Sequence, residues 1–366
     1  MLQRTSRLAA VLFAGSLALA ACGGGSEDDA ATPGADGGAK AKSLTGTISG
    51  AGSSAQSAAM QGWIAGFQTK NADATINYDP VGSGGGRDQF TAGGVAFAGT
   101  DRAMKPEEIT KAAARCNGGT VVDLPLYISP IAVAFNLDGI KKLNLKPATI
   151  AQIFNQKITK WNDPAIQADN KDAKLPDLKI TPVNRSDDSG TTENFTDYLA
   201  KTAAADWTYP ATGKWPVAGG EAANGTSGVI GAIKAGKGAI GYADASQVGE
   251  LGKVAVGVGT GFVDYTPEAA AAVVGGSPRD TTRQKGDIVV KIARDTTKST
   301  EYPVVLVSYS LACTKYADPA QSALVKGFLS YIASKEGQDA AAKSAGSAPI
   351  SDSLRTEVEA SIAAIG

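Results

Sequence analysis

The chain has 366 residues, and its 35 lysines and arginines against 36 aspartates and glutamates give a formal net charge of -1, which argues against a nucleic-acid-binding protein with its usual basic excess. Histidine is absent, which excludes a histidine general base, a serine–histidine triad and histidine metal ligands. Hydrophobic residues make up 43%, enough for one large or two medium domains.

The N-terminus is predicted to be an export signal. Two arginines in "MLQRTSR" precede the apolar run "LAAVLFAGSLALAA", which is too short to cross a membrane comfortably. The run ends in Leu-Ala-Ala-Cys22, which resembles the lipobox of bacterial lipoproteins, whose cysteine becomes the first residue and carries lipid. We expect residues 1–21 to be removed and Cys22 to anchor the protein at the outer face of the cell membrane. The alternative is an ordinary signal peptide with an incidental cysteine.

A flexible tether is predicted to follow, so that residues 22–43 comprise the lipidated Cys22 and the tether. Residues 23–43 contain no aromatic or large aliphatic side chain and cannot form a core. No later segment has the composition of a transmembrane helix, so the mature protein is expected to be anchored rather than to span the membrane.

Two cysteines remain if Cys22 carries lipid. These are Cys116 and Cys313, which lie far apart in the sequence. Outside the cytosol, two remaining thiols favour a disulfide, and two buried free thiols are the alternative.

From Leu44 onward, strand patterns alternate with helix patterns. Strand patterns lie within 44–54, 74–90, 95–104, 127–139, 178–201, 237–248 and 302–313. Helix patterns lie within 58–70, 148–166, 178–201 and 321–344. This alternation predicts an α/β fold with a mainly parallel sheet, in which ligands bind at the carboxyl ends of strands.

Four loops rich in glycine and hydroxyl residues follow predicted strands. They are Gly50–Ser54, Gly82–Gly86, Thr100-Asp101 and Arg185–Thr192. Backbone N–H groups at helix N-termini bind anions, and glycine lets the backbone approach closely. Arg185 adds a fixed fork of donors with a permanent charge. Together the loops predict a dehydrated pocket for a small tetrahedral oxyanion.

The aspartates in these loops need separate roles, because a carboxylate repels an anion unless the anion carries a proton. We expect Asp101 to accept such a proton, which phosphate carries at neutral pH and sulfate lacks. Asp187 is expected to pair with Arg185 and hold its rotamer. Asp188 is interpreted as an exposed turn or helix N-terminal residue.

Each signal has a plainer interpretation when taken alone. A glycine-rich turn is usually only a turn, and an aspartate at a strand end is usually a cap. Ser189-Gly190-Thr191 could be an ordinary helix cap, and a lone arginine is more often a surface residue. The oxyanion site depends on all four loops having matching chemistry at strand ends.

Several segments resemble, in order, those of the periplasmic-type phosphate-binding proteins of bacterial ABC phosphate importers. They are "GAGSS", "YDPVGSGGGRDQF", "FAGTDRAM", "ITKWNDPAI", "NRSDDSGTTENF", "GAIGYADAS" and "YPVVLVSYS". The resemblance implies the type II periplasmic-binding-protein fold, with two α/β lobes that close over phosphate and two crossover strands. It assigns 44–129 and 303–366 to lobe I and 130–302 to lobe II.

The resemblance also implies a set of ligand-binding residues. Those placed on phosphate are Ser54, Ala55 through its backbone, Ser83, Asp101, Arg185, Ser189, Gly190 and Thr191, with Asp187 orienting Arg185. The family often has Thr-Phe where this chain has Ser54-Ala55, so an aromatic cover is lost. Whether Arg87 or Tyr127 shields the pocket instead is left open.

The expected function is phosphate capture for the membrane permease subunits of an ABC importer, by a monomer without enzymatic activity, metal or cofactor. A secreted phosphoryl-transfer enzyme is an alternative, but the chain has no histidine and no dense aspartate cluster outside the loops. A structural lipoprotein or adhesin is another, against which the intact Arg185 motif argues. Sulfate, molybdate and phosphonate are rival ligands, and Asp101 is the discriminating residue.

Overall fold

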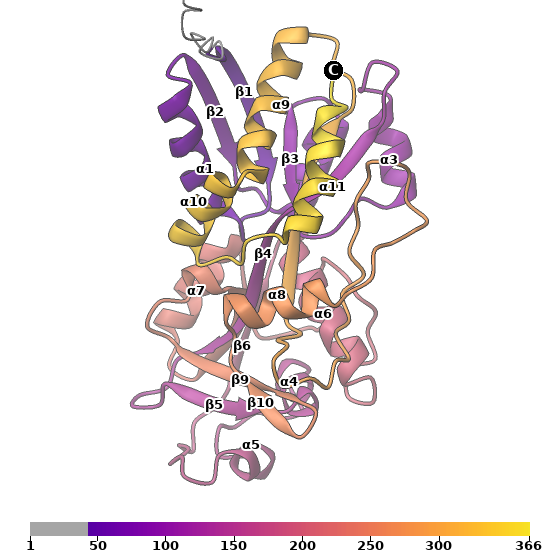
Figure 1. Ribbon diagram of the computed structural model, residues 1–366. Coiled ribbons are helices and arrows are strands. Elements are labelled where there is room, and N and C mark those ends of the chain that lie inside the picture. The colour runs from indigo at the N-terminus through magenta and orange to yellow at the C-terminus, as the bar shows by residue number, and fades with distance from the viewer. Residues whose placement is uncertain (1–42) are drawn as a thin grey trace, which may run out of the picture. The chain divides into compact units, whose positions relative to one another are not determined.

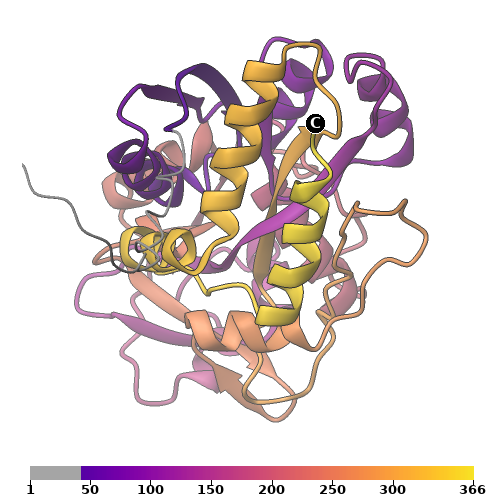
Figure 2. The ribbon, with the colours of Figure 1, turned by 45° about the horizontal axis from the view of Figure 1, so that its top comes forward.

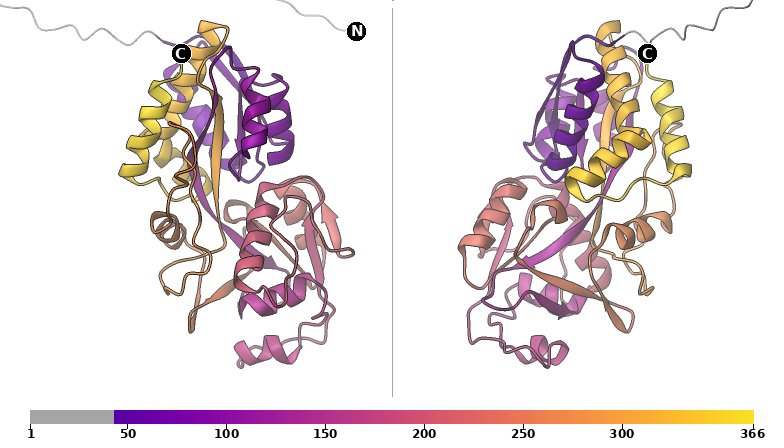
Figure 3. Two further views of the ribbon diagram at one scale, coloured as in Figure 1. Left: turned by 90° about the vertical axis from the view of Figure 1, so that its right-hand side faces the viewer. Right: turned by 60° about the vertical axis from the view of Figure 1, so that its left-hand side comes forward.

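The computed structural model describes residues 43–366, which form one compact unit. The predicted signal peptide, Cys22 and the tether up to residue 42 lie outside the described residues. Two α/β lobes are connected by the long strands β4 (Val121–Phe135) and β11 (Val305–Cys313) (Figure 1, Figure 3). β4 pairs with β11 through residues 121–130 and with β8 (Ala239–Asp244) through residues 131–135, so one strand belongs to both lobes. The two-lobed α/β fold is therefore confirmed.

The first lobe contains a sheet in the order β2-β1-β3-β11-β4. Its remaining strands are β1 (Gly46–Gly52), β2 (Ala74–Asp79) and β3 (Phe97–Thr100). Its helices are α1 (Ser57–Lys70), α2 (Ser83–Thr91), α3 (Pro106–Ala113), α9 (Pro319–Ala333), α10 (Lys335–Ala345) and α11 (Asp352–Ala363). Figure 2 shows α9 and α11 side by side over one face of this sheet.

The chain between the two crossover strands supplies the second lobe. Its strands are β5 (Lys142–Leu145), β6 (Thr181–Arg185), β7 (Glu221–Ala223), β8, β9 (Gly252–Val258) and β10 (Gly261–Val263). The helices of this chain segment are α4 (Pro147–Phe154), α5 (Pro164–Asp169), α6 (Gly190–Thr202), α7 (Gly225–Ala235) and α8 (Pro267–Gly275). A short 3-10 turn over Ala245–Gln247 follows β8 directly.

The sheets are mixed, whereas a mainly parallel sheet was predicted. Away from the crossover strands, pairing is parallel in β1–β2, β1–β3, β5–β9, β6–β7 and β6–β8. The crossover strands reverse this pattern, because β4 and β11 run antiparallel to each other and to their other neighbours. β10 also pairs antiparallel with β9. Alternating strands and helices predict only the parallel part of such a fold.

The predicted helix at 321–344 is divided into α9 and α10. At Ser334 the backbone is extended (φ -61°, ψ 157°), and its hydroxyl accepts the N–H of Gly337 at 3.1 Å. A Cβ on Gly337 would lie 2.0 Å from the carbonyl oxygen of Tyr331, so glycine is required at this bend. The single-helix prediction was wrong because the apolar pattern continues through a capped break.

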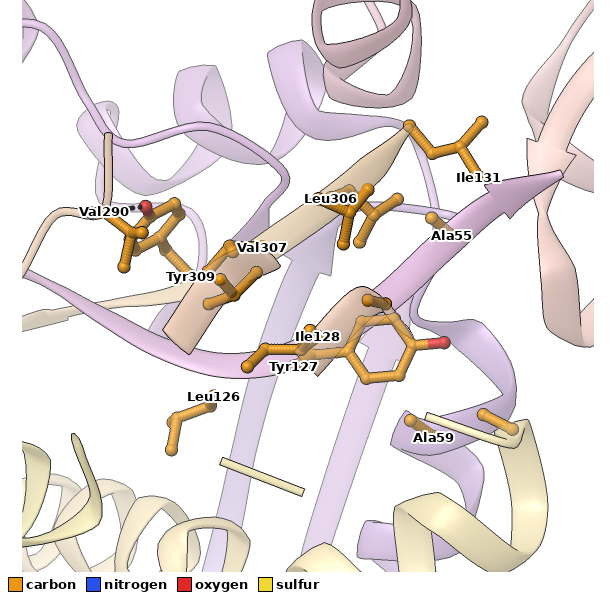
Figure 4. Close-up of a cluster of buried hydrophobic side chains, with 14 of the residues drawn as sticks. Ala55, Ala59, Leu126, Tyr127, Ile128, Ile131, Val290, Leu306, Val307 and Tyr309 are labelled. Carbon is orange, nitrogen blue, oxygen red and sulfur yellow. Dashed lines mark hydrogen bonds between the residues drawn. The ribbon is translucent and has the colours of Figure 1, made fainter. Parts of the chain in front are cut away.

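The lobes meet around a core of buried side chains on the crossover strands (Figure 4). Tyr127, Ile131 and Leu306 are almost fully buried there, and Ala55 packs close by from the loop after β1. The hydroxyl of Tyr302 donates to the carbonyl of Ile131 at 2.9 Å. Burial on both faces explains why β4 is an almost continuous apolar run.

The chain after α8 contacts the first lobe. Arg283 Nη2 lies 2.7 Å from Asp123 Oδ2 at the start of β4, and the N–H of Ile288 donates to the carbonyl of Asp123 at 3.0 Å. The sequence assigned these residues to lobe II. The lobe boundaries remain a prediction, but the segment after α8 is bonded to strand β4 where that strand belongs to the sheet of the first lobe.

Cys116 and Cys313 are joined by a disulfide, as predicted. The bond ties the end of β11 to the loop after α3 across a separation of 197 residues. Both cysteines are fully buried in the first lobe. In residues 43–366, no helix is long and apolar enough to cross a membrane.

Candidate functional site

The four loops singled out in the sequence meet where the two lobes touch. Three of them follow β1, β2 and β3 in the first lobe, and the fourth joins β6 to α6 in the second lobe. Thr191 Oγ1 donates to Asp101 Oδ2 at 3.1 Å, and Asn194 Nδ2 donates to the carbonyl of Asp101 at 2.6 Å. The structure therefore brings the predicted residues of both lobes together.

Asp101 is held by hydroxyl groups, and only 3% of the residue is exposed. Ser308 on β11 donates to Asp101 Oδ1, while Thr191 donates to the other carboxylate oxygen. The Asp101 N–H donates to Ser83 Oγ at 3.1 Å, which places the predicted ligand residue Ser83 beside the carboxylate. Each oxygen of the Asp101 carboxylate therefore accepts one hydroxyl and can accept further donors.

Arg185 is braced by Asp187, as predicted. Arg185 Nε donates to Asp187 Oδ1 at 2.7 Å, and Nη2 donates to the other oxygen. Burial opposes ionisation of Asp187, but the hydrogen bonds and charge of Arg185 outweigh it and hold the pKa of Asp187 below its usual value. Among residues 43–366 the Arg185 guanidinium has no hydrogen-bond acceptor besides Asp187.

The backbone of Arg185 is hydrogen-bonded to a cluster of packed aromatic side chains. Its N–H donates to the hydroxyl of Tyr242 at 3.3 Å, and that hydroxyl is also bonded to Thr192 Oγ1 at 2.7 Å. Phe195 and Trp215 stack on the Tyr242 ring, with centroids 4.4 Å and 5.6 Å away. The start of the loop after β6 is therefore held by packed aromatic rings.

The Ser189-Gly190-Thr191 run is both a helix start and a lobe contact. Ser189 caps α6, with its hydroxyl accepting the N–H of Thr192 at 3.2 Å. A Cβ on Gly190 would lie 2.6 Å from Ser83 Oγ and 2.7 Å from the Cβ of Asp101. Glycine is needed here because the lobes approach so closely. The plain-cap interpretation is correct for Ser189 but incomplete for the run.

Ser54 contacts a residue that the sequence did not reveal. Its hydroxyl is 3.0 Å from Thr226 Oγ1 and accepts the N–H of Thr226 at 3.1 Å. Thr226 lies in the first turn of α7 in the second lobe. The N–H of Ala55, expected on the ligand, donates to Ser53 Oγ at 3.1 Å. Its predicted contact with phosphate would require this bond to be shared or replaced.

Asp188 is partly exposed, as expected, but it also makes contacts between the lobes. Its carboxylate lies 3.2 Å from Arg87 Nη2 in the first lobe, and its carbonyl accepts the N–H of Gly84 at 3.0 Å. Its side chain is 38% exposed, whereas that of Arg87 is 6% exposed. Asp188 therefore lies at the start of α6 and is partly exposed, as expected, and the sequence did not reveal its ion pair with Arg87 on α2 of the other lobe.

A second buried carboxylate lies at the end of β8. Asp244 is fully buried and accepts the hydroxyl of Tyr127 at 3.2 Å, together with donors of Ser246. Burial raises the pKa of Asp244 to about 6, against hydrogen bonds from Ser246 that lower it. The Tyr127 hydroxyl is therefore bonded to Asp244, and shielding of the pocket by Arg87 or Tyr127 stays a prediction.

Two cavities reach this region. One of about 290 Å³ has Asp101 and Asn194 in its lining, and one of about 530 Å³ has Ser54 and Asn224. Each is lined by residues of both lobes, as expected for a ligand cleft in a two-lobed protein. Among residues 43–366, no group of three or more cysteine, aspartate or glutamate side chains is placed to hold a metal ion.

The fold and site define a two-lobed solute-binding protein, and comparison with known proteins agrees. A family model described as a PBP superfamily domain matches residues 37–336. The structure named as a high-affinity periplasmic phosphate-binding protein (PfluDING) bound with phosphate has a TM-score of 0.70 at 22% identity, covering 86% of this chain and 93% of that one. A phosphate-binding protein from Stenotrophomonas maltophilia has a TM-score of 0.62 at 18% identity, covering 86% and 94%. At these identities the likeness concerns the fold alone.

Relatives with higher sequence identity show the family to which the chain belongs. Phosphate-binding protein PstS 3 of Mycobacterium tuberculosis is 34% identical over 347 residues, which cover 90% of each chain. Phosphate-binding protein PstS2 of Mycobacterium bovis is 32% identical over 372 residues, which cover 99% of each. The chain belongs to the PBP superfamily and, within it, to the family of PstS phosphate-binding proteins.

Proposed function

We propose that this chain binds inorganic phosphate, as HPO₄²⁻ or H₂PO₄⁻, between its two lobes and delivers it to an ABC importer. The observation that carries the proposal is the contact between Asp101 of the first lobe and Thr191 of the second. In this contact the proposed proton acceptor meets the loop proposed to bind the anion, and Thr191 lies four residues after Asp187 and six after its partner Arg185. The names of the family relatives support the same ligand.

The site residues divide into donors and one acceptor. Arg185 supplies charge through the guanidinium edge that Asp187 leaves free, and Asp187 holds that edge in place. Asp101 accepts the proton of phosphate. The remaining donors are Ser54, the backbone of Ala55, Ser83, Ser189, Gly190 and Thr191.

Discrimination against sulfate follows from the acceptor. Sulfate carries no proton at neutral pH, so Asp101 would face it with like charge and with no proton to share between them. In a buried site such a mismatch is costly, because neither group can turn to water. Phosphonate and molybdate are disfavoured to the extent that they lack an OH group at the same place.

The protein acts outside the cytosol as an exported solute-binding protein. We further propose that lipid on Cys22 anchors it to the outer face of the cell membrane, where it meets the permease subunits as a monomer. The family consists of non-enzymatic transport components, which removes the phosphoryl-transfer alternative.

Calorimetric titration in phosphate-stripped buffer tests the function. Phosphate should bind tightly with one site per chain, and sulfate should give no comparable heat. Arg185→Ala should weaken phosphate binding by about a hundredfold or more, because it removes a charge and a charge-assisted hydrogen bond from a buried site. Absence of phosphate binding, or equal binding of sulfate, would overturn the proposal. Unchanged affinity in Arg185→Ala would place the site elsewhere.

A further inference from the structure

Two ion pairs join the lobes beside the phosphate loops. Arg102 Nε lies 2.9 Å from Glu193 Oε2, and Arg87 Nη2 lies 3.2 Å from Asp188 Oδ1. Both arginines belong to the first lobe and both acids to the second. These pairs can therefore exist only when the lobes are in contact.

The pairs are close to the predicted ligand residues in sequence as well as in space. Arg102 follows Asp101 directly, and Glu193 lies in the first turn of α6, two residues after Thr191. Asp188 precedes Ser189 directly. Loops that present donors to phosphate thus also present opposite charges to each other.

Glu108 in the first lobe lies beside both arginines. Glu108 on α3 binds Arg102 Nη1 at 2.6 Å and lies 3.5 Å from Arg87 Nε. Burial opposes ionisation of Glu108, but the hydrogen bond and charge of Arg102 outweigh it and lower the pKa of Glu108 to about 2. When the lobes separate, the guanidinium groups of Arg87 and Arg102 have only the Glu108 carboxylate as a shared partner. When the lobes close, Asp188 and Glu193 become additional partners.

Partial burial makes these pairs stronger than ordinary surface pairs. The side chains of Arg102 and Glu193 are 15% and 19% exposed, and that of Arg87 is 6% exposed. Exposed ion pairs contribute little, because water and salt screen them, whereas partly buried pairs are screened less.

We propose that Arg87, Arg102, Asp188 and Glu193 are positioning residues that set phosphate affinity by stabilising the closed arrangement of the lobes, without touching the ligand. The inference rests on the proposed function. A ligand that binds across both lobes has its apparent affinity reduced by the fraction of protein that is open. Interactions present only in the closed state raise affinity by reducing that fraction, and they slow ligand release.

Neutral variants of the two acids test the inference. Glu193→Gln and Asp188→Asn each remove one pair and keep the side-chain shape, while Glu108 stays to accompany both arginines. Each should weaken inorganic phosphate binding about three- to tenfold, and the double variant more. The change should appear mainly as faster phosphate release in stopped-flow measurements. The affinity of the double variant should also depend less steeply on sodium chloride than that of the wild type.

A matched control breaks an ion pair within one lobe. Asp339→Asn removes the exposed pair between Lys335 and Asp339 on α10, 2.8 Å apart, and should leave affinity and salt dependence unchanged. Circular dichroism establishes that each variant is folded, and either acid variant alone suffices for the test. The inference alone is overturned if the wild type binds phosphate tightly and both acid variants have dissociation constants within about twofold of it, with the same salt dependence. A wild-type protein that binds no phosphate overturns the proposed function and this inference together.

Discussion

Asp101 and Arg185 are two buried groups of opposite charge that we propose to bind the same anion. Arg185 is turned toward the site by Asp187, which uses two of its nitrogens. Asp101 is kept in place by Ser308 and Thr191. The two carboxylates therefore differ in their surroundings, since Asp187 orients a cation and Asp101, bonded to two hydroxyl groups, is the proposed acceptor of the ligand's proton.

Asp101→Asn tests the acceptor role. An amide can donate to a fully deprotonated oxyanion, so the variant should bind sulfate better and phosphate worse. The affinity ratio of phosphate to sulfate should fall by about two orders of magnitude. Parallel calorimetric titrations with the two anions measure it. Full selectivity in the variant would show that another group recognises the proton.

Asp244 predicts a pH dependence of stability. Its pKa is raised to about 6 in the folded protein by burial, with a smaller contribution from the charge of Asp101, against hydrogen bonds from Ser246. Because the pKa of Asp244 is higher in the folded state than in the unfolded state, its protonation stabilises the folded protein. This stabilisation is fully present below the unfolded pKa of about 4 and is lost as pH rises through about 6. The free energy of unfolding of Asp244→Asn, taken relative to that of the wild type, should therefore rise by about 2–3 kcal/mol between pH 4 and pH 7.

Urea unfolding of wild type and Asp244→Asn across this pH range measures the difference. Comparing the two proteins cancels the titration of other groups. A stability difference that stays constant with pH would mean that Asp244 does not titrate in this window.

At the scale of elements, the contact between the lobes depends on glycine. A Cβ on Gly84 in α2 would lie 2.5 Å from the Cβ of Asp188 in the other lobe. Gly84→Ala should therefore hinder closure and weaken phosphate binding roughly five- to hundredfold, while each lobe stays folded. Gly231→Ala on α7 is the control, because a Cβ there meets nothing within 4 Å. Equal affinity in both variants would contradict a closed lobe contact at α2.

The disulfide acts within the first lobe. Removing it by Cys116→Ser with Cys313→Ser should lower the free energy of unfolding by about 2–5 kcal/mol, since a cross-link over 197 residues restricts the unfolded chain. Denaturant unfolding with and without reductant measures this. The wild type should become less stable on reduction, and the double variant should not respond. Equal stability of all samples would contradict a stabilising bond.

The sequence predicts local features of this site better than its long-range ones. Loops at strand ends could be found from glycine, hydroxyl and charged residues, and the structure brings them together. The partnership of Ser54 with Thr226 spans 172 residues, and no periodicity or motif connects them. The same holds for Arg102 with Glu193, which are 91 residues apart. Such pairs arise from the docking of two lobes, which local patterns do not encode.

The whole molecule combines a shared framework with a separable contact. β4 and β11 are continuous, buried strands that belong to the connection between lobes, and they also carry Ser308 beside the carboxylate of Asp101. The four loops and the helices that follow them touch across the lobes through hydrogen bonds and ion pairs. Polar contacts of this kind can separate into water, which suits a protein that must release its ligand.

A crystal structure of the protein grown with phosphate tests the central claim most directly. The account predicts one tetrahedral anion between the two lobes, within hydrogen-bonding distance of the Asp101 carboxylate and the Arg185 guanidinium. Phosphate bound at another place, or contacting one lobe only, would contradict it.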